Sequence, residues 1–407
     1  CLSFLIFNSS LLIGTVRYVS KTGTSTPPYT SWATAADSIQ KCINMCVDGD
    51  TIYVANGLYV EQINVNRSIS LIGSSMDSTI IDGMYAVPYY VIYFSVNGSI
   101  ENFNVIGNGS EAVIGIGTFN ANVIVRHCRV DNIDYGITID LSTSLVEDCI
   151  IKNCGERNIR DECAPDTCHS IYRNNIIISN NASTAVYLSY GGYPTFINNI
   201  VIDEGSNSWN GIFSGQKPGA LISNNLVGGY TNEGISIGAV TIDTTFINNN
   251  ILFNNPSQAI VTGTGNRTII KNNILRDSDI GINKYNSSNT RSDYNLFWNV
   301  QNLMMGQPFI GNSNIVADPM FVNDTIPTAY SNYDFHLQKY SPAIDKGDPN
   351  ILDVDGSRSD IGLFGGPLGE SYTYQDLAPK PPRNLTASMD SGLVHLKWNK
   401  NTEADLF

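Results

Sequence analysis

Charged residues are scarce in this 407-residue chain, at 15% of the total against 42% hydrophobic residues. Basic residues are the scarcer kind: Lys and Arg number 23 and Asp and Glu number 37, so the formal net charge is −14. Nucleic acids are held mainly by Lys and Arg contacts to phosphate, so we expect no nucleic-acid partner. An anionic polysaccharide would need a local basic patch or a bridging metal ion.

The chain also lacks an apolar run long enough to cross a membrane. Residues 2–13 (LSFLIFNSSLLI) are apolar, but a transmembrane helix needs about 20 residues. We interpret residues 1–14 as the remaining part of a signal peptide. The less favoured alternative is a lipid-modified Cys1, because an apolar run directly after that cysteine is unusual in a mature lipoprotein. The sequence therefore predicts a secreted or cell-surface protein with no membrane span, and we expect it to be a monomer.

What the sequence does contain is a recurring sequence motif, which we call the first phrase. Residues 196–201 read Phe-Ile-Asn-Asn-Ile-Val, and related phrases occur at 172–177, 222–227, 247–252 and 270–275. Aligned on the fourth residue, the copies fall at positions 103, 128, 149, 175, 199, 225, 250, 273 and 295. A repeat of about two dozen residues is typical of a solenoid.

A second phrase lies inside each repeat. Residues 136–139 (Gly-Ile-Thr-Ile), 185–188 (Ala-Val-Tyr-Leu) and 234–237 (Gly-Ile-Ser-Ile) are short, β-branched and bounded by turn residues, which predicts strands. Two or three short strands in each repeat, with no helical periodicity between them, predict a right-handed parallel β-helix. The repeated Asn would then fall at one turn, with its side-chain amides hydrogen-bonded along the axis.

Together the two phrases resemble the repeat of the pectin-lyase-like superfamily, from about residue 50 to about residue 366. The resemblance implies an all-β chain with a parallel β-helix over residues 15–370. Enzymes of this superfamily cleave acidic polysaccharides by β-elimination or by hydrolysis. The sequence lacks the Gly-His-Gly setting of polygalacturonases, the Gly-Arg-Pro-Trp signature of pectin methylesterases and a lyase Arg-x-Pro-x-x-Arg motif. We therefore hold two hypotheses: an exported protein that binds acidic polysaccharide, such as pectin or alginate, and cleaves it by β-elimination, or a non-catalytic cell-surface or adhesive module.

Both ends of the predicted β-helix carry further signals. Ile39, Cys42, Ile43 and Cys46 have the spacing of an apolar helix face, which predicts a helix that caps the N-terminal end. Residues 371–381 are predicted to be a stiff linker. Residues 382–407 resemble the first two strands of a fibronectin type III domain, an incomplete β-sandwich with Trp398 as its buried indole.

The candidate catalytic residues lie where the second phrase is replaced by a charged, Cys-rich stretch, residues 154–169. We expect Cys163 and Cys168 to form a disulfide. A zinc site formed by these two cysteines with Cys154 and His169 is a less favoured alternative. The catalytic candidates, chosen as bases for β-elimination, are Arg157, Arg160 and Lys152.

Two other groups of residues complete the predicted site. The column two places before the repeated Asn carries Glu101, Arg126, Glu147 and Arg173, which predicts exposed ion pairs between coils. Carboxylates and aromatic residues at the turn between the phrases would suit Ca²⁺-bridged uronates and sugar stacking, although solvated turns use the same residues. The substrate-binding candidates are Arg126, Arg173, His169, Trp209 and Tyr230, and the Ca²⁺ candidates are Asp203, Glu204 and Glu233. Residues 353–360 loosely suit Ca²⁺ as well, but a hydrogen-bonded turn is favoured there.

Overall fold

The computed structural model describes residues 14–83, 89–107, 113–163, 168–205, 207–215, 219–238, 243–265, 267–285, 289–306, 309–323, 334–381 and 384–403. The predicted signal peptide therefore lies outside the described residues, except for Gly14. The chain forms two compact units, Cys1–Gly155 and Glu156–Phe407. No helix in the described ranges is long and apolar enough to cross a membrane.

The first unit consists of short parallel strands in three columns, in which each strand pairs with a strand of a neighbouring coil. The first column contains β1 (Val16–Val19), β2 (Thr51–Val54), β5 (Ser70–Gly73), β8 (Gly98–Glu101), β11 (Val123–Arg126) and β13 (Leu145–Glu147). The second contains β3 (Gly57–Val60), β6 (Thr79–Asp82), β9 (Asn104–Ile106) and the start of β12 (Arg129–Asp140). The third contains β4 (Ile63–Val65), β7 (Tyr90–Phe94), β10 (Ile114–Phe119) and the end of β12.

A short helix, α1 (Ile39–Ile43), lies near the start of the first unit. Its apolar residues Ile39, Cys42 and Ile43 are buried, as the sequence spacing indicates. The Glu61 carboxylate accepts hydrogen bonds from the backbone N–H groups of Ile39 and Gln40, both at 2.9 Å. A carboxylate at this position satisfies N–H groups that have no partner inside the helix. The role of α1 as a cap of the β-helix stays a prediction.

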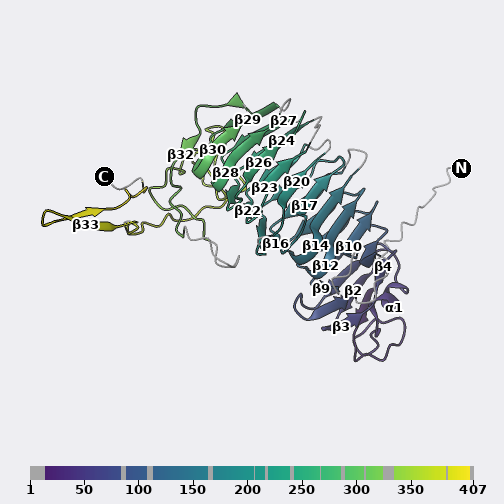
Figure 1. Cartoon of the computed structure of the whole chain (residues 1–407). Helices are drawn as coiled ribbons and strands as arrows, with labels where there is room; N and C mark the ends of the chain where they lie inside the picture. Colours follow the sequence, from purple (N-terminus) through teal and green to yellow (C-terminus); the bar gives the residue numbers. More distant parts are fainter. Residues whose placement is uncertain are drawn as a thin grey trace. The chain divides into compact units, whose positions relative to one another are not determined.

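The second unit has the same three columns (Figure 1). Its first column contains β15 (Ile171–Arg173), β18 (Thr195–Ile197), β21 (Leu221–Ser223), β24 (Thr244–Asn248), β27 (Arg267–Lys271), β29 (Asn289–Asp293) and β31 (Phe309–Ile310). The second contains β16 (Ile176–Ser179), β19 (Ile200–Asp203), β22 (Leu226–Gly228), β25 (Ile251–Phe253), the starts of β28 (Ile274–Lys284) and β30 (Leu296–Met305), and β32 (Ile315–Val316). The third contains the end of β14 (Ile150–Glu162), then β17 (Thr184–Ser189), β20 (Asn210–Ser214), β23 (Glu233–Ile237), β26 (Gln258–Thr262) and the ends of β28 and β30. The prediction of an all-β chain with parallel β-helix architecture is confirmed.

The first Asn of each Asn-Asn pair forms the turn between the first and second columns. The backbone is left-handed there, with φ of 57° at Asn174, 55° at Asn198 and 54° at Asn224. Asn adopts this conformation at a lower cost than most residues. In the first unit His127 and Asp148 take the equivalent position, with φ of 48° and 54°.

The second Asn of each pair belongs to a buried column of hydrogen-bonded amides. The backbone N–H and the Nδ2 group of Asn225 both donate to Asn250 Oδ1, at 2.9 and 3.0 Å. Asn225 Nδ2 also donates to the carbonyl oxygens of Phe196 and Ser223, both at 2.9 Å. Buried polar groups need such partners, so these bonds tie each coil to the next. We call this set the asparagine column; its members are the buried Asn175, Asn199, Asn225, Asn250, Asn273 and Asn295 and the half-buried Asn314.

The outer side of the second column is covered by residues 334–381, which we call the C-terminal strap. Its apolar residues join one buried cluster with the strands. The strap is also held by first-position Asn residues: Asn224 Nδ2 donates to the carbonyl oxygens of Leu363 and Gly365, both at 2.8 Å. This cover explains why the second column is apolar on both sides of its strands. The cluster contains Ile202, Leu226, Ile251, Phe253, Ile274, Leu296, Phe321, Phe335, Leu337, Ala343 and Ile361.

Beyond the strap, β33 (Thr386–Asp390) and β34 (Leu393–Lys397) form an antiparallel hairpin. Its residues are exposed, and the Trp398 indole, which was predicted to be buried, is 52% exposed. The described residues therefore contain a two-stranded sheet here. Its membership of a fibronectin type III domain stays a prediction.

Candidate functional site

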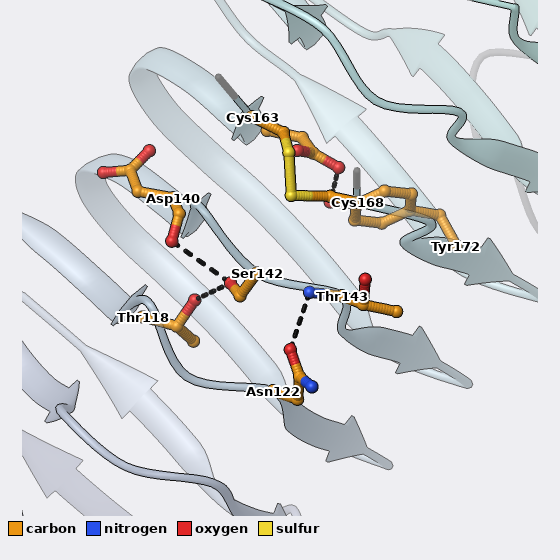
Figure 2. Close-up of a disulfide and its surroundings, with 9 residues drawn as sticks. Thr118, Asn122, Asp140, Ser142, Thr143, Cys163, Cys168 and Tyr172 are labelled. Carbon is orange, nitrogen blue, oxygen red and sulfur yellow. Dashed lines mark hydrogen bonds between the residues drawn. A yellow bond between two sulfur atoms is a disulfide. The ribbon is translucent and has the colours of Figure 1, made fainter. Parts of the chain in front are cut away.

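The predicted disulfide between Cys163 and Cys168 is confirmed (Figure 2). It is anchored to the next coil, because the Tyr193 N–H donates to the Cys168 carbonyl oxygen at 2.8 Å. Gly192 lies against the disulfide with φ of 82°, and a Cβ atom there would lie 3.0 Å from the same carbonyl oxygen. The enclosed residues 164–167 lie outside the described part of the chain.

The disulfide also contradicts the alternative zinc site, since two of its four ligands are bonded to each other. The third, Cys154, is buried, and burial raises the pKa of its thiol well above the usual range. A thiol with a raised pKa is a poor metal ligand and a poor nucleophile. Within the described ranges, no group of three or more His, Cys, Asp or Glu side chains is arranged to hold a metal ion.

The charged stretch before the disulfide continues the regular third column. Ile159 pairs with Val186 in register, and Arg160 pairs with Tyr187. Residues 158–161 (Asn-Ile-Arg-Asp) therefore take the position that Gly-Ile-x-Ile occupies in other coils. In the sequence this stretch looks like an interruption, because its polar residues surround the single apolar residue, Ile159, that is buried in the core.

A stack of a cation and two aromatic rings lies on the outer side of this column. Val186 and Leu188 are buried, so Tyr187 between them points outward. The Arg157 guanidinium lies 3.9 Å from the centroid of the Tyr187 ring. The Tyr187 ring in turn stacks on Phe213 of the next coil, with centroids 5.1 Å apart and planes 15° apart. We call Arg157, Tyr187 and Phe213 the cation–aromatic stack; the two aromatic residues were not among the predicted site residues.

Two glycines leave room for the Phe213 ring: Gly215, directly after β20, and Gly238, directly after β23 of the next coil. A Cβ atom on Gly215 would lie 2.4 Å from Phe213 Cε1, and one on Gly238 would lie 2.9 Å from Phe213 Cζ. Side chains at these two positions would displace the ring. Tyr187 and Phe213 are both half-buried, so part of each ring faces outward.

Two acidic residues, Glu156 and Glu162, lie on β14, the strand that carries Arg157. Glu162 forms an ion pair with Arg160, and Glu156 Oε2 accepts a hydrogen bond from Ser183 Oγ at 3.1 Å. Arg160 is thus engaged with a carboxylate instead of being available as a base. Carboxylates at the edge of a binding surface accept hydrogen bonds from sugar hydroxyl groups.

In the first unit, Lys152 and Arg126 are also paired with acids. Lys152 Nζ lies 3.2 Å from Asp131 Oδ2. Arg126 pairs with Glu147, and this hydrogen bond raises the pKa of Arg126 above its ordinary value. The predicted coil-to-coil register of Arg126 and Glu147 is confirmed, but Glu147 is buried where an exposed pair was predicted.

The remaining substrate-binding candidates differ in exposure. His169 is exposed and its ring stacks on Tyr193, with centroids 5.2 Å apart. Arg173 is exposed on β15, and Trp209 is 60% exposed directly before β20. Tyr230 is fully buried, with its hydroxyl 3.3 Å from Ser179 Oγ. Tyr230 is therefore part of the core and not of a surface ridge.

The Ca²⁺ candidates do not gather around a common point. The Asp203 carboxylate is buried and accepts hydrogen bonds from the backbone N–H groups of Asn207 and Ser208, both at 2.9 Å. Glu204 is exposed and Glu233 is half-buried on β23. Asp203 thus shapes its own turn, and its oxygens already have protein donors.

Residues 353–360, the other Ca²⁺ candidate, form a hydrogen-bonded turn. Asp355 Oδ1 accepts from the backbone N–H and the hydroxyl of Ser357, at 2.9 and 2.6 Å. Asp353 accepts from the N–H groups of Asp360 and Gly366. The favoured interpretation of this segment agrees with these bonds.

Comparison with known proteins defines the class of the fold. No family model matches the chain, and no curated protein matches it. Among solved structures, the chain is similar to pectate lyase Pel9A at 16% identity and a TM-score of 0.56, over 86% of this chain and 97% of that chain. It is also similar to XylC, solved in complex with xylose, at 11% identity and a TM-score of 0.53, over 69% of this chain and 75% of that chain. At these identities the likeness shows a shared parallel β-helix fold.

Proposed function

We propose that the second unit binds an acidic polysaccharide along the outer face of its third column. The observation that carries this proposal is the cation–aromatic stack on adjacent coils. Flat aromatic rings pack against the apolar faces of sugar rings, and a guanidinium group binds carboxylates with two parallel hydrogen bonds. A surface that combines both suits a polymer of uronate units.

Other features support the proposal. Trp209 is an exposed aromatic residue directly before β20, the strand that carries Phe213. His169 and Tyr193 add a second stacked pair beside the disulfide. The disulfide is typical of an oxidising compartment, which favours export. One structural neighbour is a pectate lyase and another was solved with xylose, so the fold is compatible with saccharide ligands.

The second candidate function is cleavage of the same polymer by β-elimination. One observation favours Arg157 as its base: in the described residues its Nε is buried without a hydrogen-bond partner. Arginine acts as a base only when a strongly electropositive or desolvated site lowers its pKa. Glu156 and Glu162 near this strand oppose that requirement, so binding without turnover is the better-supported function.

Binding can be tested by measuring the affinity of the purified chain for polygalacturonate, alginate and neutral dextran. We expect the two acidic polymers to bind more tightly than dextran. Tyr187→Ala and Arg157→Gln should each weaken acidic-polymer binding about tenfold, the effect of losing about 1.4 kcal/mol. The matched control is Phe246→Ala, which removes an exposed ring from β24 in the first column.

The same samples decide between binding and cleavage. Absorbance from unsaturated uronates that develops with the wild type and is lost in Arg157→Gln would establish the lyase. Absence of that signal together with specific binding would establish the binding module. Equal affinity for dextran and polygalacturonate, or an equal loss in Phe246→Ala, would contradict the proposed surface.

A further inference from the structure

A groove of about 650 Å³ lies in the second unit, where the strap ends. Strands β28 and β30 supply one wall, and the other consists of Asp318, the end of the strap and residues 399–403. Its volume is in the usual range for sites that bind small molecules. The groove is lined by Arg276, Asp277, Trp298, Asn299, Asp318, Lys380, Pro381, Asn399, Lys400, Asn401, Thr402 and Glu403.

The strand wall places a guanidinium group beside an indole. Arg276 and Trp298 are partners in register on β28 and β30, so their backbones are about 4.8 Å apart. The Arg276 side chain is only 9% exposed, and its Nε donates to Asp277. Asp277 is fixed in turn by Asn299 Nδ2, 2.7 Å from its Oδ1. The Arg276 guanidinium also lies 5.9 Å from the centroid of the Phe321 ring. In the described residues the Arg276 side chain makes no other hydrogen bond, so its two terminal amino groups remain available to a ligand.

The opposite wall is held in place by a buried carboxylate. Asp318 Oδ2 accepts a hydrogen bond from Thr402 Oγ1 at 2.7 Å and lies 3.6 Å from Lys380 Nζ. Glu403 accepts hydrogen bonds from the Lys380 backbone N–H at 3.0 and 3.1 Å. These contacts bring residues 318, 380 and 402 together from distant parts of the sequence. The groove is therefore a built feature of the fold.

The charges of the groove define the chemistry of its ligand. Three acids and three bases line it, so the lining carries no net formal charge and does not favour a ligand with several negative charges. A single carboxylate can bind the free amino groups of Arg276. Neighbouring carboxylates accept hydrogen bonds from hydroxyl groups, and the Trp298 indole offers a flat apolar surface.

We propose that this groove binds a single sugar acid, a hydroxyl-rich ring with one carboxylate. Arg276 holds the carboxylate, Trp298 packs against the ring, and the acidic side chains accept hydrogen bonds from its hydroxyl groups. The site shares no residue with the cation–aromatic stack, so it extends the proposed function to a second, monosaccharide-sized position. An experiment can therefore refute either proposed site without refuting the other.

The test is calorimetric titration of the whole chain with glucuronate, glucose and inorganic phosphate. We expect glucuronate to bind about tenfold more tightly than glucose, the effect of one charged hydrogen-bonded contact, and phosphate not to bind. Arg276→Gln should reduce glucuronate affinity to that of glucose. Trp298→Ala should weaken both sugars, and Trp32→Ala, which removes an exposed indole in the first unit, should change neither.

Arg276 is buried, so its replacement could disturb folding, and a second variant avoids this problem. Lys400 is exposed at the groove, and Lys400→Glu should weaken glucuronate binding while leaving glucose binding unchanged. Tyr187→Ala should leave glucuronate binding intact, which separates this proposal from the polymer-binding surface. Failure of glucuronate to bind, phosphate binding at least as tight as glucuronate binding, or unchanged glucuronate affinity in Trp298→Ala would overturn the proposal.

Discussion

The asparagine column should be one of the most sensitive parts of the second unit to mutation. Asn225→Ala removes the Oδ1 that accepts from the N–H and Nδ2 groups of Asn199, at 2.9 and 3.0 Å. It also removes the Nδ2 that donates to Phe196, Ser223 and Asn250. Asn225 is completely buried, so water cannot replace these partners. Each buried polar group that loses its partner costs about 1–3 kcal/mol, and we expect the unfolding free energy to fall by about 3–5 kcal/mol.

Urea unfolding followed by circular dichroism measures this loss. The matched control is Asn198→Gly. Asn198 is the exposed first residue of the Asn pair one coil earlier, and its φ is 55°. Glycine adopts that backbone conformation without strain, so we expect a change within about 0.5 kcal/mol. A loss below about 1 kcal/mol for Asn225→Ala, or an equal loss in the control, would refute the idea that the buried amides hold the coils together.

Three further predictions concern the strap, the disulfide and the buried ion pair. Burial raises the pKa of Asp360 to about 6, so the contribution of its protonated carboxyl group to stability is complete below about pH 4 and is lost as pH rises through 6. Denaturation between pH 4 and 7.5 should show a fall of about 3 kcal/mol in the unfolding free energy, which Asp360→Asn abolishes. An identical pH profile in that variant would contradict this prediction. Replacing both Cys163 and Cys168 by Ser should cost about 2 kcal/mol and make stability independent of reductant; continued sensitivity to dithiothreitol would point to a different bond. Glu147→Gln should cost about 2 kcal/mol, between the values for exposed and buried pairs, because it leaves Arg126 without its carboxylate; a loss below about 0.5 kcal/mol in thermal or urea unfolding would mean that the pair is only a surface contact.

The fold could be predicted from the sequence because its period is local and repeated. A short strand, a turn and a second strand recur every 21 to 26 residues, with an Asn pair at the turn in most coils of the second unit, and a parallel stack brings equivalent residues into register. The pairing of Ile176 with Ile200 and of Ile200 with Leu226 follows that alignment. The disulfide was predictable for a similar reason, since its cysteines are only five residues apart.

The candidate site was less predictable because burial at the turns depends on neighbouring coils. Tyr230 looks like a surface aromatic in the sequence, but Gly211 has no side chain and leaves space for its ring: a Cβ atom there would lie 2.9 Å from Tyr230 Cδ2. Lys152 looked available for catalysis until the structure placed Asp131 beside it. The spacing of charged residues along one coil does not reveal their partners on the next.

The two proposed binding surfaces were missed for different reasons. Tyr187 and Phe213 each occupy the variable position of an ordinary strand phrase, and only their equivalent positions on adjacent coils bring their rings together. That signal was present in the repeat alignment. The groove had no comparable signal. Arg276 and Lys380 both line it, but Lys380 is brought there by the path of the strap and not by a repeat.

The most direct test of the polymer-binding surface is hydroxyl-radical footprinting of the chain with and without polygalacturonate. This method reports the solvent accessibility of individual aromatic side chains. The proposed function predicts that Tyr187 and Phe213 become protected by the polymer, while Phe246 on the first column is unchanged. Protection of Phe246 with no change at Tyr187 and Phe213 would contradict it.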